Sequence, residues 1–132
     1  MSRPNEVKAY SGPYSSITRL ADGAITEASV VKKGTNAKDV AEASAGDKPL
    51  GVVAADTVGT DKVEDNDQAE IVTSGIVRVE ASAAVAQGEV VKAAASGKVQ
   101  PTTGDGTDQA NLHVGKALTS ASQDGDVIEV AL

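Results

Sequence analysis

The chain has 132 residues, a length typical of one domain, and a net charge of -7 at neutral pH. This charge disfavours nucleic acid as the main partner, because a phosphate-binding surface needs clustered Lys and Arg. The absence of Cys excludes disulfides, thiolate catalysis and Cys-ligated zinc. No apolar run approaches the roughly 20 residues of a membrane span, and no apolar signal segment follows the start. We therefore expect a soluble protein that is not classically secreted.

The first 20 residues differ in charge from the rest of the chain. They carry three basic residues and one acidic residue, a balance of +2, whereas residues 21–132 carry 9 basic and 18 acidic residues, a balance of -9. The basic and aromatic side chains of this segment are Arg3, Lys8, Tyr10, Tyr14 and Arg19. We predict that residues 1–20 form an N-terminal arm and residues 21–132 a β-barrel domain. Without residues 2–19, the barrel should keep its β-sheet.

Short Val-rich runs separated by Gly predict many short strands beyond residue 21. The runs cover residues 29–33, 50–54, 69–73, 75–80, 89–92 and 126–132. In the last run Ile128, Val130 and Leu132 fall on one face, the period-2 pattern of a half-buried strand. The one helix candidate, residues 81–87, is scarcely two turns long, so we expect a turn or a short helix there. The sequence predicts an all-β fold, a small compact barrel or sandwich of short strands.

The apolar residues are mostly Val and Ala, with two Tyr and no Phe or Trp. Large aromatic side chains usually dominate a core, so this chain has less apolar area with which to offset the entropy lost on folding. The predicted core is therefore shallow. Association with other copies or with a partner surface would supply the missing burial.

A faint internal repeat relates the two halves. Residues 24–32 (AITEASVVK) resemble residues 84–92 (AVAQGEVVK), and residues 49–54 (PLGVVA) resemble residues 113–118 (HVGKAL). In each half a turn leads into a Val-Val-Lys strand, a polar hairpin follows, and a Gly-containing apolar strand returns. This order predicts two similar β-units that close one barrel.

Motifs for catalysis or nucleotide binding are missing. The single histidine, His113, lies in a predicted strand, and no Gly-x-Ser-x-Gly elbow accompanies it. Neither a Walker A sequence nor a Gly-x-Gly-x-x-Gly motif occurs. We predict no catalytic residues and no cofactor.

Two acidic loops, residues 61–67 and 103–108, could offer oxygen ligands to Ca²⁺, but neither has the ligand spacing of an EF-hand. Asp, Asn and Gly favour turns regardless of metal, so we predict solvated hairpins and no metal site. A small ligand-binding or carrier module of a larger enzyme assembly is the alternative function. Carrier domains bear a modified lysine at a hairpin tip, whereas Lys32 and Lys92 end Val-Val strands.

Four stretches together resemble a family of capsid decoration (cement) proteins of tailed viruses that infect bacteria or archaea. They are residues 24–34, 45–53, 85–92 and 115–130, and the resemblance spans roughly residues 20–132. The order of elements carries the resemblance: a Gly-Asp or Gly-Glu turn feeds a Val-Val strand, a Leu-Gly-Val strand follows, and an Asp-Gly-Asp-Val strand ends the chain.

The resemblance implies a structural virion protein that is made in the host cytoplasm and binds the exterior of the major capsid protein shell. It implies a β-barrel that commonly assembles as a homotrimer, and no catalysis. The charge and the hydropathy separately predict that neither nucleic acid nor a membrane is a partner, and the missing motifs predict no cofactor. Related proteins often use an N-terminal arm that orders on the capsid. The residues expected to contact the capsid are Arg3, Lys8, Tyr10, Tyr14 and Arg19.

Overall fold

The computed structural model describes residues 10–54, 62–102 and 112–132, with residues 10–13 described by their backbone alone. The described residues contain eleven β-strands and the 3₁₀ turn η1. The strands are β1 (Tyr10–Ala21), β2 (Ile25–Thr26), β3 (Val30–Lys33), β4 (Asp39–Glu42), β5 (Gly51–Val53), β6 (Lys62–Val63), β7 (Gln68–Glu80), β8 (Val90–Ala93), β9 (Val99–Pro101), β10 (His113–Ala117) and β11 (Val127–Ala131). The 3₁₀ turn, η1, is Ala95–Gly97. The predicted all-β fold is confirmed, and none of the helical segments in these ranges could cross a membrane.

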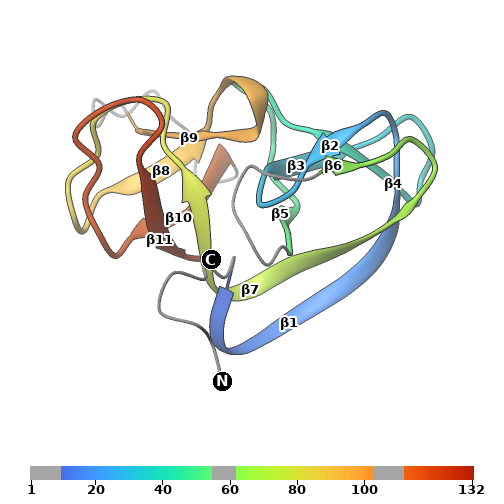
Figure 1. The fold of residues 1–132 in the computed structure, drawn as a ribbon, viewed down its shortest axis with the longest axis horizontal. Helices are drawn as coiled ribbons and strands as arrows, with labels where there is room; N and C mark the ends of the chain where they lie inside the picture. Colours follow the sequence, from blue (N-terminus) through green and yellow to red (C-terminus); the bar gives the residue numbers. More distant parts are fainter. Residues whose placement is uncertain (1–9, 55–61, 103–111) are drawn as a thin grey trace.

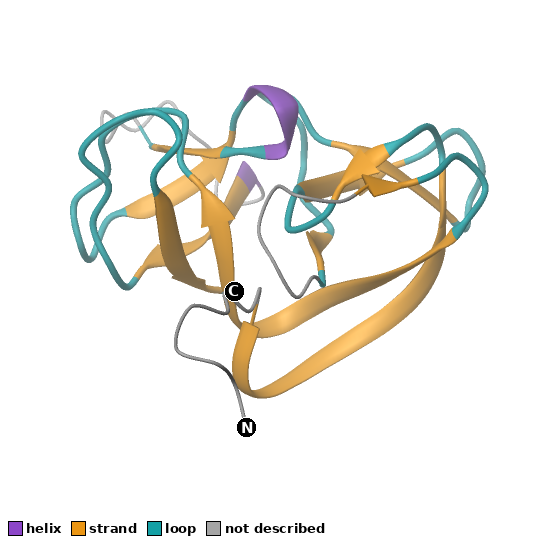
Figure 2. Cartoon of the chain, viewed as in Figure 1, coloured by secondary structure: helices purple, strands orange, loops and turns teal. Residues whose placement is uncertain are grey.

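Strands β1 and β7 form a long antiparallel ribbon beneath two groups of shorter strands (Figure 1). The first half of β7 pairs with β5, and its second half pairs with β11. We call residues 16–72 the first lobe and residues 76–132 the second lobe. Loops cap both lobes away from the ribbon, and η1 lies between them (Figure 2).

Strand pairing closes on itself in each lobe. In the first lobe the order β1-β4-β3-β5-β7 returns to β1, because β1 pairs with β4 on one edge and with β7 on the other. In the second lobe the order β7-β11-β10-β8-β9 returns to β7 through a parallel bridge between Val99 and Ala81. The sequence predicted two units that close one barrel, whereas in the structure the pairings of each unit close separately.

The same hydrogen bonds recur in both lobes. Ala21 N–H donates to Asp67 O at 2.9 Å, and sixty residues later Ala81 N–H donates to Asp126 O at 2.8 Å. The parallel pairing is also shared, since the bridge from Ala81 to Val99 corresponds to the pairing of Ala21 with Val40. The internal repeat predicted from the sequence is therefore a repeat of structure.

One glycine in each lobe allows the close passage of two strands. A Cβ on Gly51 would lie 2.4 Å from Val72 O, and a Cβ on Gly115 would lie 2.1 Å from Ala131 O. Both distances are far below van der Waals contact. Both lobes therefore have Gly at this position, because no side chain fits between the two strands.

The outer face of the first lobe is apolar and covered. Val52 lies between Val30 on β3 and Val72 on β7, and all three side chains are fully buried. They belong to the same cluster as Val77 and Val114 of the second lobe. A separate, smaller cluster fills the interior of the first lobe. The second lobe therefore buries the outside of the first.

The corresponding face of the second lobe is exposed. Here Lys116 lies between Val90 and Ala131, in the same register as the three valines of the first lobe. Lys116 is exposed, and Val90 and Ala131 are half-buried. A lysine suits this position because nothing among the described residues covers it.

Residues 10–20 of the predicted arm lie in β1. From Ser16 to Leu20 this strand pairs with Val72 to Gln68 of β7 in continuous register. Residues 1–9 lie outside the described residues. The helix candidate at 81–87 forms turns and two isolated bridges, because Ala81 and Val85 are buried and pair with residues from other parts of the second lobe.

Candidate functional site

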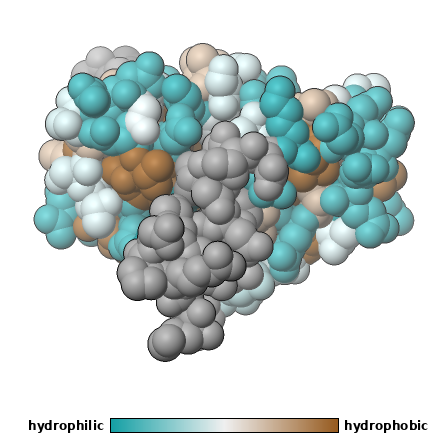
Figure 3. Space-filling view, viewed as in Figure 1, coloured by the Kyte–Doolittle hydropathy of each residue, from teal (hydrophilic) through white to brown (hydrophobic). Residues whose placement is uncertain are grey.

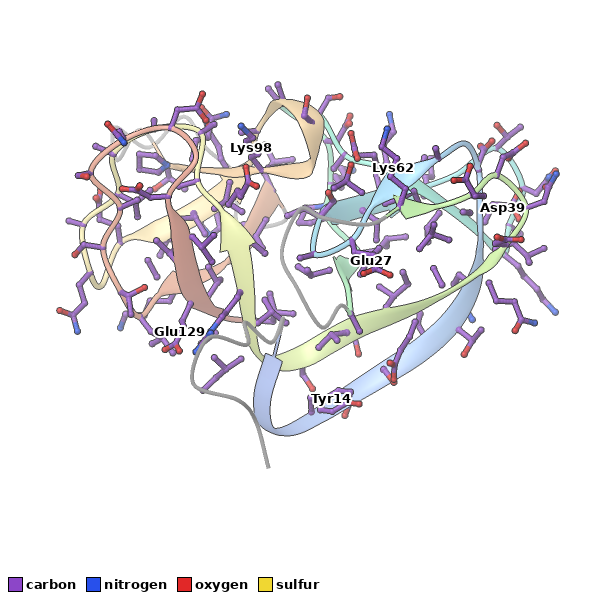
Figure 4. The ribbon with its side chains drawn as sticks, viewed as in Figure 1. Tyr14, Glu27, Asp39, Lys62, Lys98 and Glu129 are labelled. Carbon is purple, nitrogen blue, oxygen red and sulfur yellow. The ribbon has the colours of Figure 1, made fainter. Side chains whose placement is uncertain are left out.

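Strand β1 contains three of the five residues predicted to contact a partner. Tyr10 pairs through its backbone with Val77, and Tyr14 is half-buried against the larger core cluster. Figure 4 shows Tyr14 on the lower part of the ribbon. Arg19 donates from Nη1 to Thr18 O at 2.8 Å. Arg3 and Lys8 lie outside the described residues, so the proximity of all five stays a prediction.

Strand β1 also exposes two large apolar side chains that were not among the predicted contact residues. Ile17 is 37% exposed and Leu20 is 41% exposed. The other large apolar side chains exposed in the described ranges are Leu50 and Val127. On the face seen in Figure 3, hydrophobic colour is confined to small areas between hydrophilic ones. Residues 14–21 (YSSITRLA) do not alternate between apolar and polar side chains, so the sequence did not predict a strand here.

Polar groups surround the exposed part of β1. Ser16 Oγ donates to Glu70 on β7 at 2.7 Å, and Leu20 N–H donates to Lys38 O at 3.4 Å. This surface therefore combines apolar side chains, hydroxyls and both signs of charge. Such a mixture is typical of a rim or contact surface and not of a reaction centre.

His113 lies opposite Lys92 in the pairing of β10 with β8. It lines a pocket of about 190 Å³ together with Pro49, Leu50 and Leu132. The polar groups that line this pocket are Thr73 and His113. A proton-shuttling imidazole needs a nucleophile and an orienting carboxylate, and the described lining offers no carboxylate side chain.

The two acidic loops differ in what the structure shows of them. In the first loop Asp65 Oδ1 accepts the Gly23 N–H at 2.9 Å, a long-range contact that joins this loop to the turn after β1. No group of three potential metal-ligating side chains occurs within the described residues. The second loop, residues 103–108, lies outside the described residues.

The clearest ionic contact lies beside the junction of the lobes. Lys98 Nζ lies 3.0 Å from Asp124 Oδ1 and 3.5 Å from Glu80 Oε2. The hydrogen bond to Asp124, and to a lesser degree the charge of Glu80, raises the pKa of Lys98. Lys98 and Glu27 line a pocket of about 160 Å³ between the lobes, where Figure 4 labels both. The pocket is small, and Lys98 is already paired with two carboxylates. This region is therefore better suited to holding the two lobes together than to binding a ligand.

The lysines considered for a carrier function lie within strands. Lys32 is in β3, with Nζ 3.3 Å from Asp47 Oδ2, and Lys92 is in β8. A carrier lysine must project from a hairpin tip to reach separate active sites. Their positions disfavour the carrier alternative.

Comparison with known proteins assigns the chain to a family. The sequence profile of the structural cement protein family (E217 gp24/Pam3 gp6) matches residues 4–132. The solved structure of the head fiber gp8.5 N base in bacteriophage phi29 is similar, with a TM-score of 0.63 and 17% sequence identity. The alignment covers 91% of this chain and 94% of that chain, which shows a shared fold. No curated protein sequence matches. The chain belongs to the structural cement protein family of phages.

Proposed function

We propose that this protein binds the outer surface of the major capsid protein shell of a tailed virus and stabilises it. The observation that carries the proposal is the family match, which extends over residues 4–132 and so includes most of the predicted arm. The protein would reach the shell from the host cytoplasm and remain on the capsid exterior. It would act without catalysis, as a structural protein.

Strand β1 and the residues before it are the proposed contact surface. A basic segment on an otherwise acidic chain can pair with acidic groups of a shell, and such pairing directs orientation and association rate. Tyr residues bury a large area while keeping a polar tip, so they suit a contact that must also be soluble. The contact residues we propose are Arg3, Lys8, Tyr10, Tyr14 and Arg19.

We also propose that three copies assemble on the shell as a homotrimer. The Val- and Ala-rich cores support association, because they offer no Phe or Trp and the first lobe has a small interior. Light scattering on the purified protein measures the mass directly. A mass of one chain at all concentrations would contradict a stable trimer in solution.

Cosedimentation with undecorated capsids tests the capsid contact. The full chain should pellet with the shells at a fixed number of copies per shell, and saturation should occur at that ratio. Binding should weaken as salt is raised, because the proposed contacts between exposed charges are screened. Absence of cosedimentation at low salt would sink the proposal.

A charge-matched pair of variants locates the contact. Replacing Arg3, Lys8 and Arg19 by Ser should lower capsid affinity about tenfold or more. The control replaces Lys33, Lys48 and Lys116 by Ser, which removes the same charge from exposed positions elsewhere. Equal loss in both variants would show that the total charge matters and not the N-terminal segment.

A further inference from the structure

We propose that the outer edge of β1 is a pairing site for the same edge of a second copy, with Ile17 opposite Ile17 of that copy. The site lies on the first lobe, where β1 pairs with β7 along one edge and reaches β4 only through Leu20 and Ala21. The other edge of β1 before Leu20 has no strand beside it among the described residues. An unpaired edge is a template for strand addition.

The hydrogen bonds around β1 show which backbone groups point outward. Ala21 N–H donates to Asp67 O, directly before β7, whereas Leu20 N–H donates to Lys38 O, directly before β4. Because successive residues of a strand point to opposite edges, Ser16 and Thr18 share the outward direction of Leu20. Their N–H and C=O groups are therefore available at the outer edge, apart from the contact of Arg19 with Thr18 O.

The internal repeat identifies the occupant of this edge. Ile76 and Val77 on β7 occupy the place in the second lobe that Ser16 and Ile17 occupy in the first. In the second lobe this edge is filled by an antiparallel strand, since Ser11 pairs with Ile76 and Tyr10 with Val77. The strand that fills it is β1 itself. The corresponding edge of the first lobe therefore suits an antiparallel β1 from a second copy.

One register satisfies the outward groups and buries the exposed apolar residue. With the two-fold axis at Ile17, Ser16 of each copy lies opposite Thr18 of the other, and the four outward N–H groups find four outward carbonyls. Ile17 then lies opposite Ile17 of the second copy. The two residues form a non-hydrogen-bonded pair, in which the Cα atoms approach to about 4.5 Å. Its exposed side chain would be covered by the second Ile17.

Charge does not oppose this register. Residues 15–18 carry no charge, and Arg19 would lie opposite Ser15 of the other copy. Pairing requires the Arg19 guanidinium to leave Thr18 O, which it reaches from an exposed position. Because four hydrogen bonds and one apolar pair make a small interface, we expect a weak, concentration-dependent contact. If the proposed function holds, this contact would join chains that belong to different trimers. The contact itself does not require a capsid.

Disulfide trapping of the pure protein tests the site, because the chain has no Cys of its own. Under mild oxidation at high protein concentration, Ile17→Cys should form a disulfide-linked dimer at least tenfold faster than Val127→Cys. Val127 is the matched control, since it is an apolar strand residue with 43% exposure. Equal rates for the two variants would overturn the proposal, whatever the result with capsids.

A second substitution tests the backbone pairing. Thr18→Pro removes the outward N–H of Thr18 without removing a hydrogen bond to β7. In the Ile17→Cys background it should reduce the rate of dimer formation to that of Val127→Cys. An unchanged rate with an unchanged circular dichroism spectrum would show that Ile17 meets its copy without strand pairing, which contradicts the proposal.

Discussion

Val52 and Lys116 occupy the same position in the two lobes, yet Val52 is fully buried and Lys116 is exposed. Each is the middle residue of a row of three across neighbouring strands. The difference follows from the order of the lobes: the second covers the outer face of the first, and nothing in the described chain covers the second. The two side chains therefore distinguish the face of the repeated unit that forms an internal interface from the same face where it is exposed.

Exchanging the two side chains should have unequal effects. Val52→Lys places a charge in the buried junction of the lobes and should lower the free energy of unfolding by roughly 3 kcal/mol or more. Lys116→Val changes an exposed position and should alter stability by no more than about 0.5 kcal/mol. Urea denaturation followed by circular dichroism measures both. Similar losses in the two variants would contradict the assignment of Val52 to a covered face and of Lys116 to an uncovered one.

Gly115 should tolerate no side chain. In Gly115→Ala the new Cβ meets Ala131 O, so β10 and β11 must separate, and we expect a loss of roughly 2–4 kcal/mol. Gly46→Ala is the control: its φ is +86° but its surroundings are open. This control should cost only about 1 kcal/mol, the strain of the left-handed conformation. Thermal unfolding compares the two, and an equal effect would show that β10 and β11 have room to move.

Acid should destabilise the fold through its turn carboxylates. Ser122 donates from its N–H and its hydroxyl to Asp126, at 2.8 and 3.0 Å, and these bonds lower the pKa of Asp126. Thr35 lowers the pKa of Asp22 in the same way. A carboxyl with a lowered pKa in the folded state stabilises the protein above its ordinary pKa of 3.8 and loses that contribution as pH falls through the folded value.

Asp126→Asn isolates this contribution. The amide keeps an acceptor oxygen but cannot titrate, so the variant should be less stable than wild type at pH 7 and should lose less stability below pH about 4. Urea denaturation midpoints between pH 7 and pH 2.5 give both slopes. Parallel slopes for the two proteins would show that Asp126 does not contribute to acid unfolding.

Two truncations separate the start of the chain from β1. A chain lacking residues 2–9 keeps every described strand and should retain its β-sheet spectrum and unfolding midpoint. A chain lacking residues 2–19 loses most of β1, which pairs with β7 and closes the first lobe. We expect it to unfold cooperatively only in its second lobe or to aggregate. Size-exclusion chromatography and circular dichroism compare the two truncated chains. A native-like spectrum and elution volume for the chain lacking residues 2–19 would show that the fold does not need β1, as expected of an arm over residues 1–20.

Much of the fold could be predicted from the sequence because its signals are local. Alternation in residues 126–132 predicted β11, with Ile128 and Val130 buried, and Val-Val runs predicted β3, β5 and β8. The internal repeat was visible in residues 24–32 and 84–92 because each lobe needs the same turn before its Val-Val strand. The order of the Val-Val, Leu-Gly-Val and Asp-Gly-Asp-Val elements pointed to a structural virion protein, in agreement with the family match.

Only the tertiary structure determined how the units are joined. Residues 69–73 and 75–80 were predicted as two runs but form one strand, β7, whose halves pair with different lobes, and Gly75, at a φ of 115°, lies between these halves. The place of residues 10–20 in the sheet could not be predicted, because their pairing partners in β7 lie 48 to 67 residues further along the chain. Composition and alternation describe a strand; the closure of each lobe and the free edge of β1 depend on long-range pairings that no local pattern encodes.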